Sequence, residues 1–493
     1  MNDVRVLLLS SPEVQRDFDF SSKIPNLGIA SIAGNINDIC EVKIADLVVL
    51  KPKDVVPFLI KTLKTFQPDL VGFSCMSFQY PRAVELARIV KEQAQAKTVF
   101  GGYHPTLMYE EISKSSDSNV IDFIVRGEGE RTFRELIQAM IGETGYRGIK
   151  GLSYKEDGIF KHNPSRELLN LNEIKLPDRS CRLLTKGFHA FGVSIDAVET
   201  SRGCVQGCKF CSIDRMYGKS FRKYTLQRVI EDIRQVKKHG FKSVVFSDDN
   251  ITLDVNRFKR LCELIIEAGL DDLHYNTQAS ARGIALEEKL AKKMAEAGFK
   301  FVFLGIENVL KRNLEFFSKG NLSDEASRAV KLLRDNGIIV AGGFMIGNPD
   351  DKEEDLWINF QAAREMKIDF PIFFITTPYP KTKLREELLE QGLVVNLDDF
   401  STYDGIYANV RTKYLTREEI QYNMWKMAAS YYDFEWMRWN LMRKHYPIYF
   451  YKELLKLLPR YLSRKLLRKL GLKTERQFFE EDARRREFYK GVH

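Results

Sequence analysis

Short β-branched runs alternate with helical patterns over the first 145 residues of the chain. Because a parallel strand needs a crossover connection, this alternation predicts a doubly wound parallel sheet with helices on both faces. The expected strands are Val4–Leu9, Val42–Ala45, Leu70–Ser74, Thr98–Phe100 and Ile121–Val125. The expected helices lie near residues 27–38, 53–66, 80–94, 107–115 and 129–142. The N-terminal part is therefore predicted to be an α/β domain.

A second βα series starts at about residue 191. Its strands are expected near 193–199, 242–247, 272–277, 300–304, 338–345 and 371–376, and its helices near 225–238, 255–268, 286–297, 324–336 and 352–366. Six units starting afresh predict a second α/β domain, either an open sheet or a partial (β/α)6 barrel. A hairpin turning at Asp157-Gly158 and an irregular linker separate the two series, and only helices are expected from about residue 414. The predicted domains are 1–145, 146–190, 191–400 and a helical, basic 401–493.

The composition is that of a soluble protein that forms a core. Hydrophobic residues make up 44% of the 493 residues and charged residues 29%, which excludes extensive disorder. No run of about 18 apolar residues occurs, so no transmembrane helix is predicted. The N-terminus lacks the apolar core of a secretory signal, and a cytoplasmic location is expected. Seven cysteines do not make a disulfide scaffold, but three of them crowd into residues 204–211, which indicates metal ligation in a reducing compartment.

The three crowded cysteines are Cys204, Cys208 and Cys211, with the spacing C-x3-C-x2-C. Thiolates bind both iron–sulfur clusters and zinc. Structural zinc takes four protein ligands, and neither Cys181 nor His189 stands near the three in the sequence. Three thiolates on a four-iron cluster leave one iron open to a substrate. The alternative is that the three cysteines are buried or zinc-bound and purely structural.

This motif, with Phe210 just before the third cysteine, resembles that of the radical S-adenosylmethionine (SAM) superfamily. The resemblance implies a partial (β/α)6 barrel whose cysteines Cys204, Cys208 and Cys211 hold a 4Fe-4S cluster, with Phe210 as a further cofactor contact. It also implies that SAM chelates the open iron and that one electron cleaves it to a 5′-deoxyadenosyl radical. That radical removes hydrogen from an unactivated carbon of the substrate.

Strand ends further along the chain match the same family in order. The candidate SAM contacts are Asp248, Asp249, Gln278, Ser280, Arg282, Glu307, Gly343, Ile346 and Gly347. By resemblance, Asp248 or Asp249 holds the methionyl amino group, although the family's usual Gly-Gly-Glu is absent there. Arg282 suits the methionyl carboxylate because a guanidinium pairs bidentately. The carboxylate of Glu307 approaches SAM, and the strand from Gly343 meets adenine through its backbone. Taken singly, each position could instead be a plain strand end or a helix cap.

The strand ends of the first domain resemble those of the cobalamin-binding domain that precedes many radical SAM domains. The candidate cobalamin contacts are Ser74, Cys75, Gly101, Gly102, His104, Gly127 and Glu128. The domain lacks the Asp-x-His-x-x-Gly motif of cobalamin proteins that ligate cobalt with histidine, so the resemblance implies cobalamin without that ligand. The alternatives are a loop histidine for His104, a packing residue for Cys75, and a helix N-terminus with a domain-interface contact for Glu128.

The C-terminal region is rich in positive charge. Within residues 441–473 the basic side chains are Arg443, Lys444, Lys452, Lys456, Arg460, Arg464, Lys465, Arg468, Lys469 and Lys473. One interpretation is a solvated cationic helix that packs its leucines on the barrel. The other is a peripheral membrane contact, where each basic residue contributes about 1 kcal/mol on anionic lipid. Nucleic acid ranks lower, because the nearby aromatic residues are not spaced as a stacking module.

Together these patterns predict a radical SAM enzyme that uses methylcobalamin to methylate an unactivated carbon of a small-molecule or lipid substrate. Hopanoid and other lipid methylases share this layout. An electron donor such as flavodoxin or ferredoxin is the expected partner. One alternative is radical cyclisation or oxidation of the kind carried out by the anaerobic magnesium-protoporphyrin ester cyclase. The other is a non-catalytic cobalamin or iron–sulfur redox sensor, which would form no 5′-deoxyadenosine.

Overall fold

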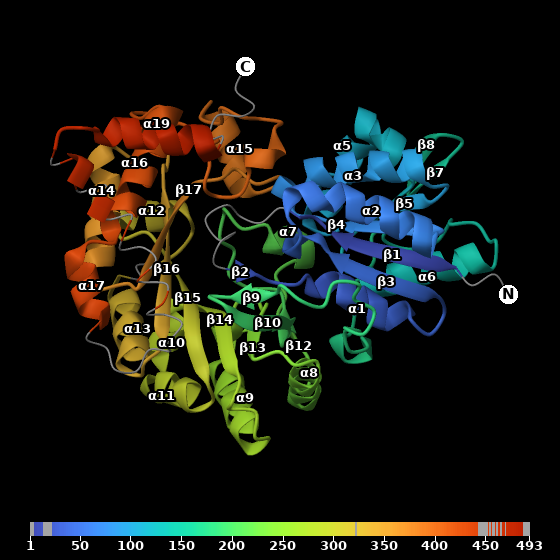
Figure 1. The fold of residues 1–493 in the computed structure, drawn as a ribbon, viewed down its shortest axis with the longest axis horizontal. Coiled ribbons are helices and arrows are strands. Elements are labelled where there is room, and N and C mark those ends of the chain that lie inside the picture. Colours follow the sequence, from blue (N-terminus) through green and yellow to red (C-terminus); the bar gives the residue numbers. More distant parts are fainter. Residues whose placement is uncertain are drawn as a thin grey trace. The chain divides into compact units, whose positions relative to one another are not determined.

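The computed structural model describes residues 4–12, 22–320, 323–441 and 470–486, with scattered positions between 452 and 468. The chain divides into two compact units, whose elements are labelled in Figure 1. Unit 1 comprises Met1–Ala190, Ser194–Val205 and Ser212–Lys242, and unit 2 comprises Phe191–Val193, Gln206–Cys211 and Ser243–His493. Cys204 therefore belongs to unit 1, whereas Cys208 and Cys211 belong to unit 2.

Unit 1 contains a seven-stranded sheet in the order β3-β1-β4-β5-β6-β7-β8. Its parallel strands are β1 (Arg5–Ser10), β3 (Glu41–Asp46), β4 (Leu70–Ser74), β5 (Lys97–Gly101) and β6 (Phe123–Val125). Its connecting helices are α1 (Leu27–Ile36), α2 (Pro52–Phe66), α3 (Tyr80–Gln93), α4 (Tyr103–Leu107), α5 (Tyr109–Lys114) and α6 (Gly129–Ile141). The predicted doubly wound sheet is confirmed. The helix expected near 107–115 is α5, and a further short helix, α4, precedes it; Met108, with φ −117°, separates the two.

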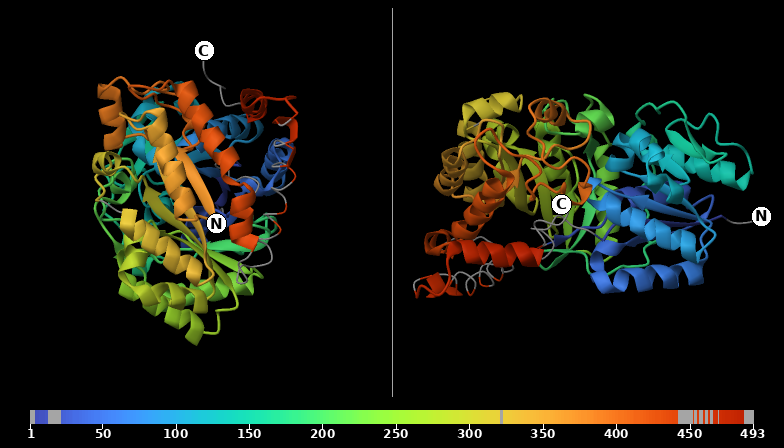
Figure 2. Two further views of the ribbon diagram at one scale, coloured as in Figure 1. Left: turned by 90° about the vertical axis from the view of Figure 1, so that its left-hand side faces the viewer. Right: turned by 90° about the horizontal axis from the view of Figure 1, so that it is seen from above.

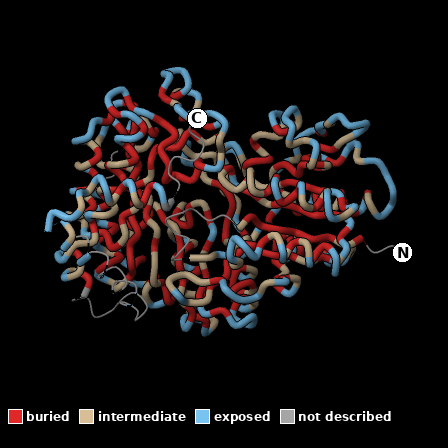
Figure 3. Tube along the Cα trace, turned by 45° about the horizontal axis from the view of Figure 1, so that its top comes forward, coloured by how far each residue is buried: buried red, intermediate tan, exposed pale blue. Residues whose placement is uncertain are grey.

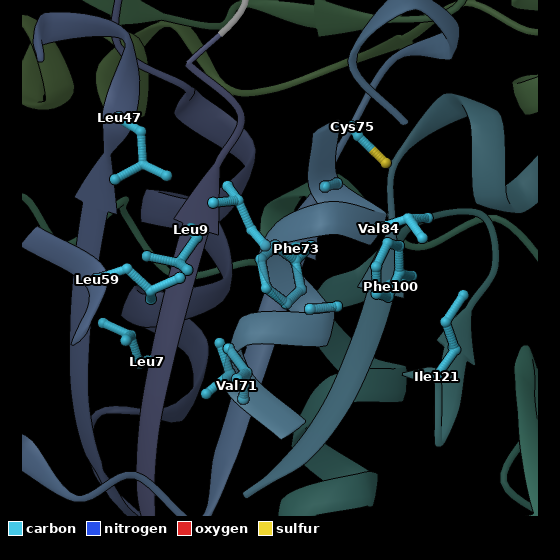
Figure 4. Packing of buried hydrophobic residues seen from close by; sticks show 14 of the residues in the cluster. Leu7, Leu9, Leu47, Leu59, Val71, Phe73, Cys75, Val84, Phe100 and Ile121 are labelled. Atoms are coloured by element: carbon cyan, nitrogen blue, oxygen red, sulfur yellow. The ribbon is translucent and has the colours of Figure 1, made fainter. Parts of the chain in front are cut away.

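The side chains of β1 point alternately into two apolar cores. Leu7 and Leu9 pack with α2 and α3 on one face, whereas Val6 and Leu8 pack with α1 and α6 on the other. Figure 4 shows the first core, in which the rings of Phe73 and Phe100 have centroids 5.1 Å apart. Helices thus cover both faces of the sheet, and the carboxyl edge of its parallel strands is where such folds bind ligands.

An antiparallel hairpin follows β6 and extends the sheet. Its strands are β7 (Leu152–Glu156) and β8 (Ile159–His162). At the turn, Asp157 and Gly158 have φ values of 51° and 77°. Two consecutive residues with positive φ are what a tight two-residue hairpin turn requires. The predicted hairpin is therefore confirmed.

Apart from helix α8, the remaining elements of unit 1 are short. They are β2 (Ser22–Lys23), β9 (His189–Ala190), β10 (Val193–Val198, all but its first residue), β11 (Ser201–Arg202), β12 (Arg222–Lys223), α7 (Ile213–Tyr217) and α8 (Leu226–Lys238). Buried ion pairs tie the irregular segment before β9 to this group. Arg179 bonds Asp196 of β10 at 3.0 Å and Asp232 of α8 at 2.6 Å, and Arg182 bonds Asp196 at 2.5 Å. Burying these charges is tolerable only because each is paired.

Unit 2 contains five consecutive parallel strands in the order β17-β16-β15-β14-β13, curled into a half-barrel sheet (Figure 2). They are β13 (Ser243–Phe246), β14 (His274–Ser280), β15 (Phe299–Glu307), β16 (Ile339–Ile346) and β17 (Phe370–Ile375). The helices are α9 (Val255–Glu267), α10 (Ala281–Leu286), α11 (Glu288–Glu296), α12 (Lys311–Phe316), α13 (Ser323–Asp335), α14 (Glu353–Glu365) and α15 (Lys383–Glu390). Every residue of β16 is buried, and Figure 3 shows the buried stretches of the chain in red.

Beyond α15, the longer elements among the described residues are helices, as predicted for the C-terminal region. They are α16 (Arg417–Tyr431), α17 (Phe434–Leu441) and α19 (Glu475–Arg486). Tyr431 donates its hydroxyl to the carbonyls of Ala363 and Ile368, at 2.9 and 2.7 Å, and so fixes α16 on α14. Most of the basic positions in 441–473 lie outside the described residues, so both interpretations of that segment stay predictions. Of the helices that the structure describes, none has the length and apolar character needed to cross a bilayer.

Candidate functional site

The carboxyl ends of the parallel strands in unit 2 carry most of the predicted SAM contacts. The strand register aligns Ser280 of β14 with Gly305 of β15, and Gly305 with Gly343 of β16. β13 ends just before Asp248 and Asp249. Since α/β sheets bind their ligands at the carboxyl ends of the strands, the fold brings these positions to the edge where a cofactor is expected.

Hydrogen bonds link the ends of β13 and β14. The side-chain amide of Gln278 donates to the backbone carbonyl of Asp248 at 2.6 Å, and Asp248 is fully buried. Ser280 is the N-cap of α10, and its hydroxyl lies 3.0 Å from that of Thr252. Arg282 is exposed on α10. The structure thus brings Asp248, Gln278 and Ser280 together but not the side chain of Arg282.

Glu307 occupies an unusual position at the end of β15. Its φ is +68°, at the point where the register against β16 shifts. A Cβ on Gly305 would lie 2.7 Å from Oε1 of Glu307, so a larger residue there would displace this carboxylate. Oε1 also lies 2.7 Å from Nζ of Lys319. A non-glycine residue with positive φ persists only where its surroundings hold it, and here the bulge, Gly305 and Lys319 do so.

The end of β16 is rigid. Ile346 is fully buried, and Gly347 has φ +78°, which turns the chain out of the strand. A Cβ on Gly343 would lie 2.6 Å from the ring of Phe303, so a larger residue here would force that ring to move. Beyond the turn, the backbone amide of Asn348 donates to the Asp351 carboxylate at 2.9 Å. The backbone groups at this strand end are therefore held in one conformation.

Residues 201–211 form the cysteine loop, whose C-terminal arm, Gln206–Cys211, belongs to unit 2. The backbone amide of Lys209 donates to the carbonyl of Phe317 at 3.3 Å, and its carbonyl accepts from the amide of Leu384 at 3.0 Å. Phe210 packs edge-on against Phe317, with ring centroids 5.3 Å apart. The residue after α12 and the start of α15 therefore hold this arm from both sides.

The thiols of Cys208 and Cys211 are half-buried and lie in the field of a cation. Nζ of Lys319 stands 5.8 Å from the centre of the Phe210 ring. Burial lowers the pKa of Lys319, but the charges of Glu307 and of the two cysteines outweigh burial, so the pKa is raised. A nearby ammonium favours the thiolate, which is the form of cysteine that binds iron.

The N-terminal arm of the cysteine loop, Ser201–Val205, belongs to unit 1. The guanidinium of Arg202 lies 2.9 Å from the carboxylate of Glu128 and 2.7 Å from that of Glu130, and all three side chains are less than a tenth exposed. Burial raises the pKa of Glu130, but the charge and hydrogen bond of Arg202 outweigh this and hold the pKa below its usual value. Arg202 thus ties the arm to the turn between β6 and α6.

Gly203 joins Arg202 to Cys204 through a turn that admits no side chain. Its φ is +89°, and a Cβ there would lie 2.4 Å from the backbone carbonyl of Ser220. Cys204 itself is half-buried. The first cysteine therefore follows a turn that only glycine can make.

The donor set fits an iron–sulfur cluster by its chemistry: three sulfur ligands in one short loop, flanked by glycines, with a cation beside two of them. In the part of the chain that the structure describes, no group of three or more Cys, His, Asp or Glu side chains is close enough to hold one metal ion. A four-iron cluster binds each thiolate through a different iron, so its ligands stand farther apart than those of a single ion.

At the carboxyl edge of the sheet in unit 1, the ends of β4 and β5 are in backbone contact. The amide of Cys75 donates to the carbonyl of Gly101 at 3.1 Å, and the Cys75 side chain joins the apolar core, where burial raises its thiol pKa. Gly102 has φ +93°, and a Cβ there would lie 2.8 Å from the Cys75 carbonyl. The Ser74 hydroxyl accepts from the side chain of Asn26 at 3.3 Å. Small residues thus form this part of the edge.

His104, the only histidine among residues 1–145, is 1% exposed. Its Nδ1 lies 3.2 Å from the Ser77 hydroxyl, and its ring lies 4.4 Å from that of Tyr80. Burial lowers its pKa to about 3, so the imidazole is neutral at physiological pH. His104 is therefore packed into the structure rather than presented at the edge.

Gly127 and Glu128 follow β6 and differ in their surroundings. Gly127 has φ +71°, and a Cβ there would meet no atom within 4 Å, so its backbone borders open space. The Glu128 carboxylate is held by Arg202 and Arg222, the latter at 2.9 Å, and accepts from the amide of Leu169 at 2.8 Å. Gly127 has room for a ligand nearby, whereas Glu128 is committed to protein contacts.

Sequence reasoning missed three residues of this site: Lys319, Arg202 and Arg222. Lys319 belongs to no motif and stands 12 residues after its partner Glu307. The sequence contains a weak indication of the two arginines, because acidic residues such as those in the Gly-Glu-Gly-Glu segment require cationic partners when they are buried. Nothing local in the sequence says which arginines these are.

Comparison with protein families gives two matches. The radical SAM superfamily matches residues 198–363, and the B12 binding domain matches residues 19–137. The first match includes all three clustered cysteines and Glu307. The second includes the predicted cobalamin contacts from Ser74 to Glu128.

Individual proteins agree with these matches. The uncharacterized methyltransferase PH0819 of Pyrococcus horikoshii is 35% identical over 83% of this chain and 88% of its own length. The anaerobic magnesium-protoporphyrin IX monomethyl ester cyclase of Cereibacter sphaeroides is 26% identical over 78% of this chain, but over 64% of the cyclase. The structure of the radical SAM methyltransferase TsrM from Kitasatospora setae, with cobalamin and a 4Fe-4S cluster bound, shares the fold. Its TM-score is 0.66 at 18% identity, with 80% of this chain and 76% of TsrM covered.

Proposed function

Because the chain belongs to the radical SAM superfamily and carries a B12 binding domain, we propose that it is a cobalamin-dependent methyltransferase acting on a carbon of a small molecule. When bound, the 4Fe-4S cluster supplies the electron that cleaves SAM, and cobalamin supplies the methyl group. The observation that carries the proposal is the short loop of three cysteines, whose C-terminal arm is anchored between α12 and α15 of the half-barrel. Cys204, Cys208 and Cys211 are the proposed cluster ligands.

At the carboxyl edge of unit 2, each residue has a distinct proposed role towards SAM. The Glu307 carboxylate, fixed by the bulge in β15, accepts from the methionyl amino group or a ribose hydroxyl. Asp248, whose carbonyl is held by Gln278, shapes the neighbouring loop. Gly347, where the chain leaves β16, offers backbone hydrogen bonds to the flat adenine ring, and Gly343 belongs to the strand beside it. Because every residue of β16 is buried, water does not reach the proposed SAM site through this strand.

In unit 1, the proposed corrinoid surface is the carboxyl edge formed by Gly101, Gly102 and Gly127. Glycines let a backbone approach a flat macrocycle closely, and the open space beside Gly127 supports this assignment. His104 is buried against Ser77 and Tyr80, which supports cobalamin binding without a histidine ligand from residues 1–145.

The proposed substrate is an apolar molecule, lipid included. Phe303 of β15 and Phe374 of β17 are half-buried, with ring centroids 6.2 Å apart, and both alternate with fully buried neighbours. Alternate residues of a strand share one face of the sheet, so these rings offer an apolar surface on the less buried face. The basic segment 441–473 supports a peripheral membrane contact, and a flavodoxin or ferredoxin is the proposed electron donor.

The direct test uses the full chain, reconstituted anaerobically with iron, sulfide and hydroxocobalamin and reduced with dithionite. Given SAM with a labelled methyl group and a total lipid extract, the enzyme should form 5′-deoxyadenosine and a product heavier by one labelled methyl group. Cys208→Ala should abolish both, whereas Cys40→Ala, outside the loop, should not. Absence of 5′-deoxyadenosine from the reconstituted wild-type protein would instead indicate a redox sensor.

A second candidate is a radical cyclase or oxidase, favoured by the 26% identity to the magnesium-protoporphyrin ester cyclase. Such an enzyme would form 5′-deoxyadenosine without transferring the label. Its product would lose hydrogen or gain oxygen, so product mass separates the two candidates.

A further inference from the structure

Lys319 is a buried lysine that the proposed function does not yet use. Ser318 before it has φ +60°, and the amide of Lys319 donates to the carbonyl of Leu314 at 2.8 Å, which closes the C-terminal end of α12. This backbone conformation sends the side chain inward, where it is 13% exposed. Lysine is rarely buried unless it is paired, so its partners define its role.

The partner of Lys319 is the carboxylate expected to contact SAM. Nζ of Lys319 and Oε1 of Glu307 are 2.7 Å apart, and the Glu307 side chain is 14% exposed. The bulge in β15 sets where the Glu307 backbone stands, and the rotatable bonds of the side chain leave the direction of the carboxylate to its contacts. Gly305 makes room for the carboxylate, and Lys319 supplies its hydrogen bond.

The same ammonium acts on the cysteine loop. It lies 5.8 Å from the centre of the ring of Phe210, the residue between Lys209 and Cys211. Phe317, two residues before Lys319, packs on that ring and accepts the backbone hydrogen bond of Lys209. The short segment Phe317–Lys319, directly after α12, therefore contacts the loop and carries the cation beside it.

We infer that Lys319 is a positioning residue with two effects at this site: it orients the Glu307 carboxylate for SAM, and its fixed positive charge eases reduction of the cluster. The inference rests on the proposed function, because it requires a cluster on Cys208 and Cys211. In the reduction step, the cluster takes up one electron from dithionite or the physiological donor. No bond forms or breaks, and Lys319 stays protonated throughout.

The test compares Lys319→Met, Lys319→Gln and Lys319→Arg with the wild type, each reconstituted anaerobically and matched for iron and sulfide content. The control is Lys311→Met at the start of α12, whose side chain is 77% exposed. An EPR-monitored dithionite titration gives the midpoint potential, which should become more negative in Lys319→Met and Lys319→Gln but not in Lys319→Arg or the control. If the Lys319–Glu307 ion pair only stabilised the fold, the cluster in the folded variants would have the same midpoint potential as in the wild type.

The second readout is SAM affinity, followed by the change that SAM causes in the EPR spectrum of the reduced cluster. The neutral variants should bind SAM about tenfold more weakly, as expected for one lost charge-assisted hydrogen bond that orients the acceptor. Potentials and affinities equal to wild type in both neutral variants would overturn the inference. If Lys319→Met does not fold, Lys319→Gln and Lys319→Arg still decide it. Failure of the wild type itself to assemble a cluster would instead refute the proposed function.

Discussion

The N-terminal arm of the cysteine loop is held in unit 1 by charged side chains, whereas the C-terminal arm is held in unit 2 by backbone hydrogen bonds and aromatic rings. Arg202 pairs with Glu128 and Glu130 in the first arm. Lys209 bonds through its backbone, and Phe210 packs on Phe317, in the second. The difference teaches that one loop can have an end sensitive to pH and an end that depends on packing. The ion pairs of the first arm are buried, whereas the Lys209–Glu387 pair of the second arm is partly exposed.

Removing the central cation of the first arm should have the largest effect. Arg202→Met leaves Glu128 and Glu130 buried beside fewer cations, and breaking a buried pair in this way costs about 3–5 kcal/mol. Hydrogen–deuterium exchange should accelerate in peptides covering residues 199–204 and 128–133, and chemical denaturation followed by circular dichroism should shift to lower denaturant. Arg131→Met, which removes a 64% exposed side chain on α6, is the control and should change neither. Unchanged exchange in Arg202→Met would contradict the charged anchor.

Removing the ring that holds the second arm should cost somewhat less. Phe317 is fully buried, and Phe317→Ala should destabilise unit 2 by about 3 kcal/mol through lost burial and a cavity. All four tryptophans, Trp357, Trp425, Trp436 and Trp439, lie in unit 2, so tryptophan fluorescence reports its unfolding. Phe434→Ala, a 69% exposed ring on α17, is the matched control. Equal midpoints for Phe317→Ala and the control would refute the aromatic anchor.

Acid should weaken the first arm. The folded-state pKa of Glu130 is held below its usual 4.5, so its stabilisation is present above pH 4.5 and is lost as the pH falls through the folded value. Glu130→Gln should therefore be less stable than wild type at pH 7, and the difference should narrow below pH 4.5. Denaturation curves recorded at several pH values measure the difference in unfolding free energy between Glu130→Gln and the wild type. A difference that stays constant with pH would show that packing, not charge, is what the substitution removes.

The smallest effect is expected from the side chain of Lys209, whose ammonium lies 2.8 Å from Glu387. Both side chains are a quarter to a third exposed, so solvent screens the pair and its coupling should be about 0.2–1 kcal/mol. A double-mutant cycle with Lys209→Met and Glu387→Gln, followed by tryptophan fluorescence, measures the coupling. A coupling several times larger would mean that the second arm, too, depends on charge.

Local patterns predicted much of the fold. The strand at Leu70–Ser74 was expected at exactly its observed bounds, and the hairpin at Asp157-Gly158 was expected from its turn residues. The extra helix α10 was not expected, since its start depends on the Ser280 cap meeting Thr252 of a distant loop. The spacing of hydrophobic residues shows which face of a single helix or strand is buried. It carries no information about a helix cap that depends on side chains from two separate loops.

The residues of the candidate site, too, divide into those that the sequence suggests and those that only the structure shows. Glu307 and Gly343 can be proposed as SAM contacts from their places at strand ends, because motif residues follow one another at short spacing, and both stay predictions. The exposure of Arg282 and the burial of His104 were not visible in the sequence, since both depend on how a short helix lies against its neighbours.

The sequence by itself determined the two βα series and the crowding of three cysteines into residues 204–211. Both can be recognised from residues that are close together in the chain: the first from the spacing of hydrophobic residues, the second from the spacing of the cysteines. Only the tertiary structure decided that Arg202 meets acids 74 and 72 positions away and that Lys319 faces Glu307. Such pairings arise when the sheet brings distant loop ends to one edge, and the free energy of a buried charge then depends on the partner that happens to be there.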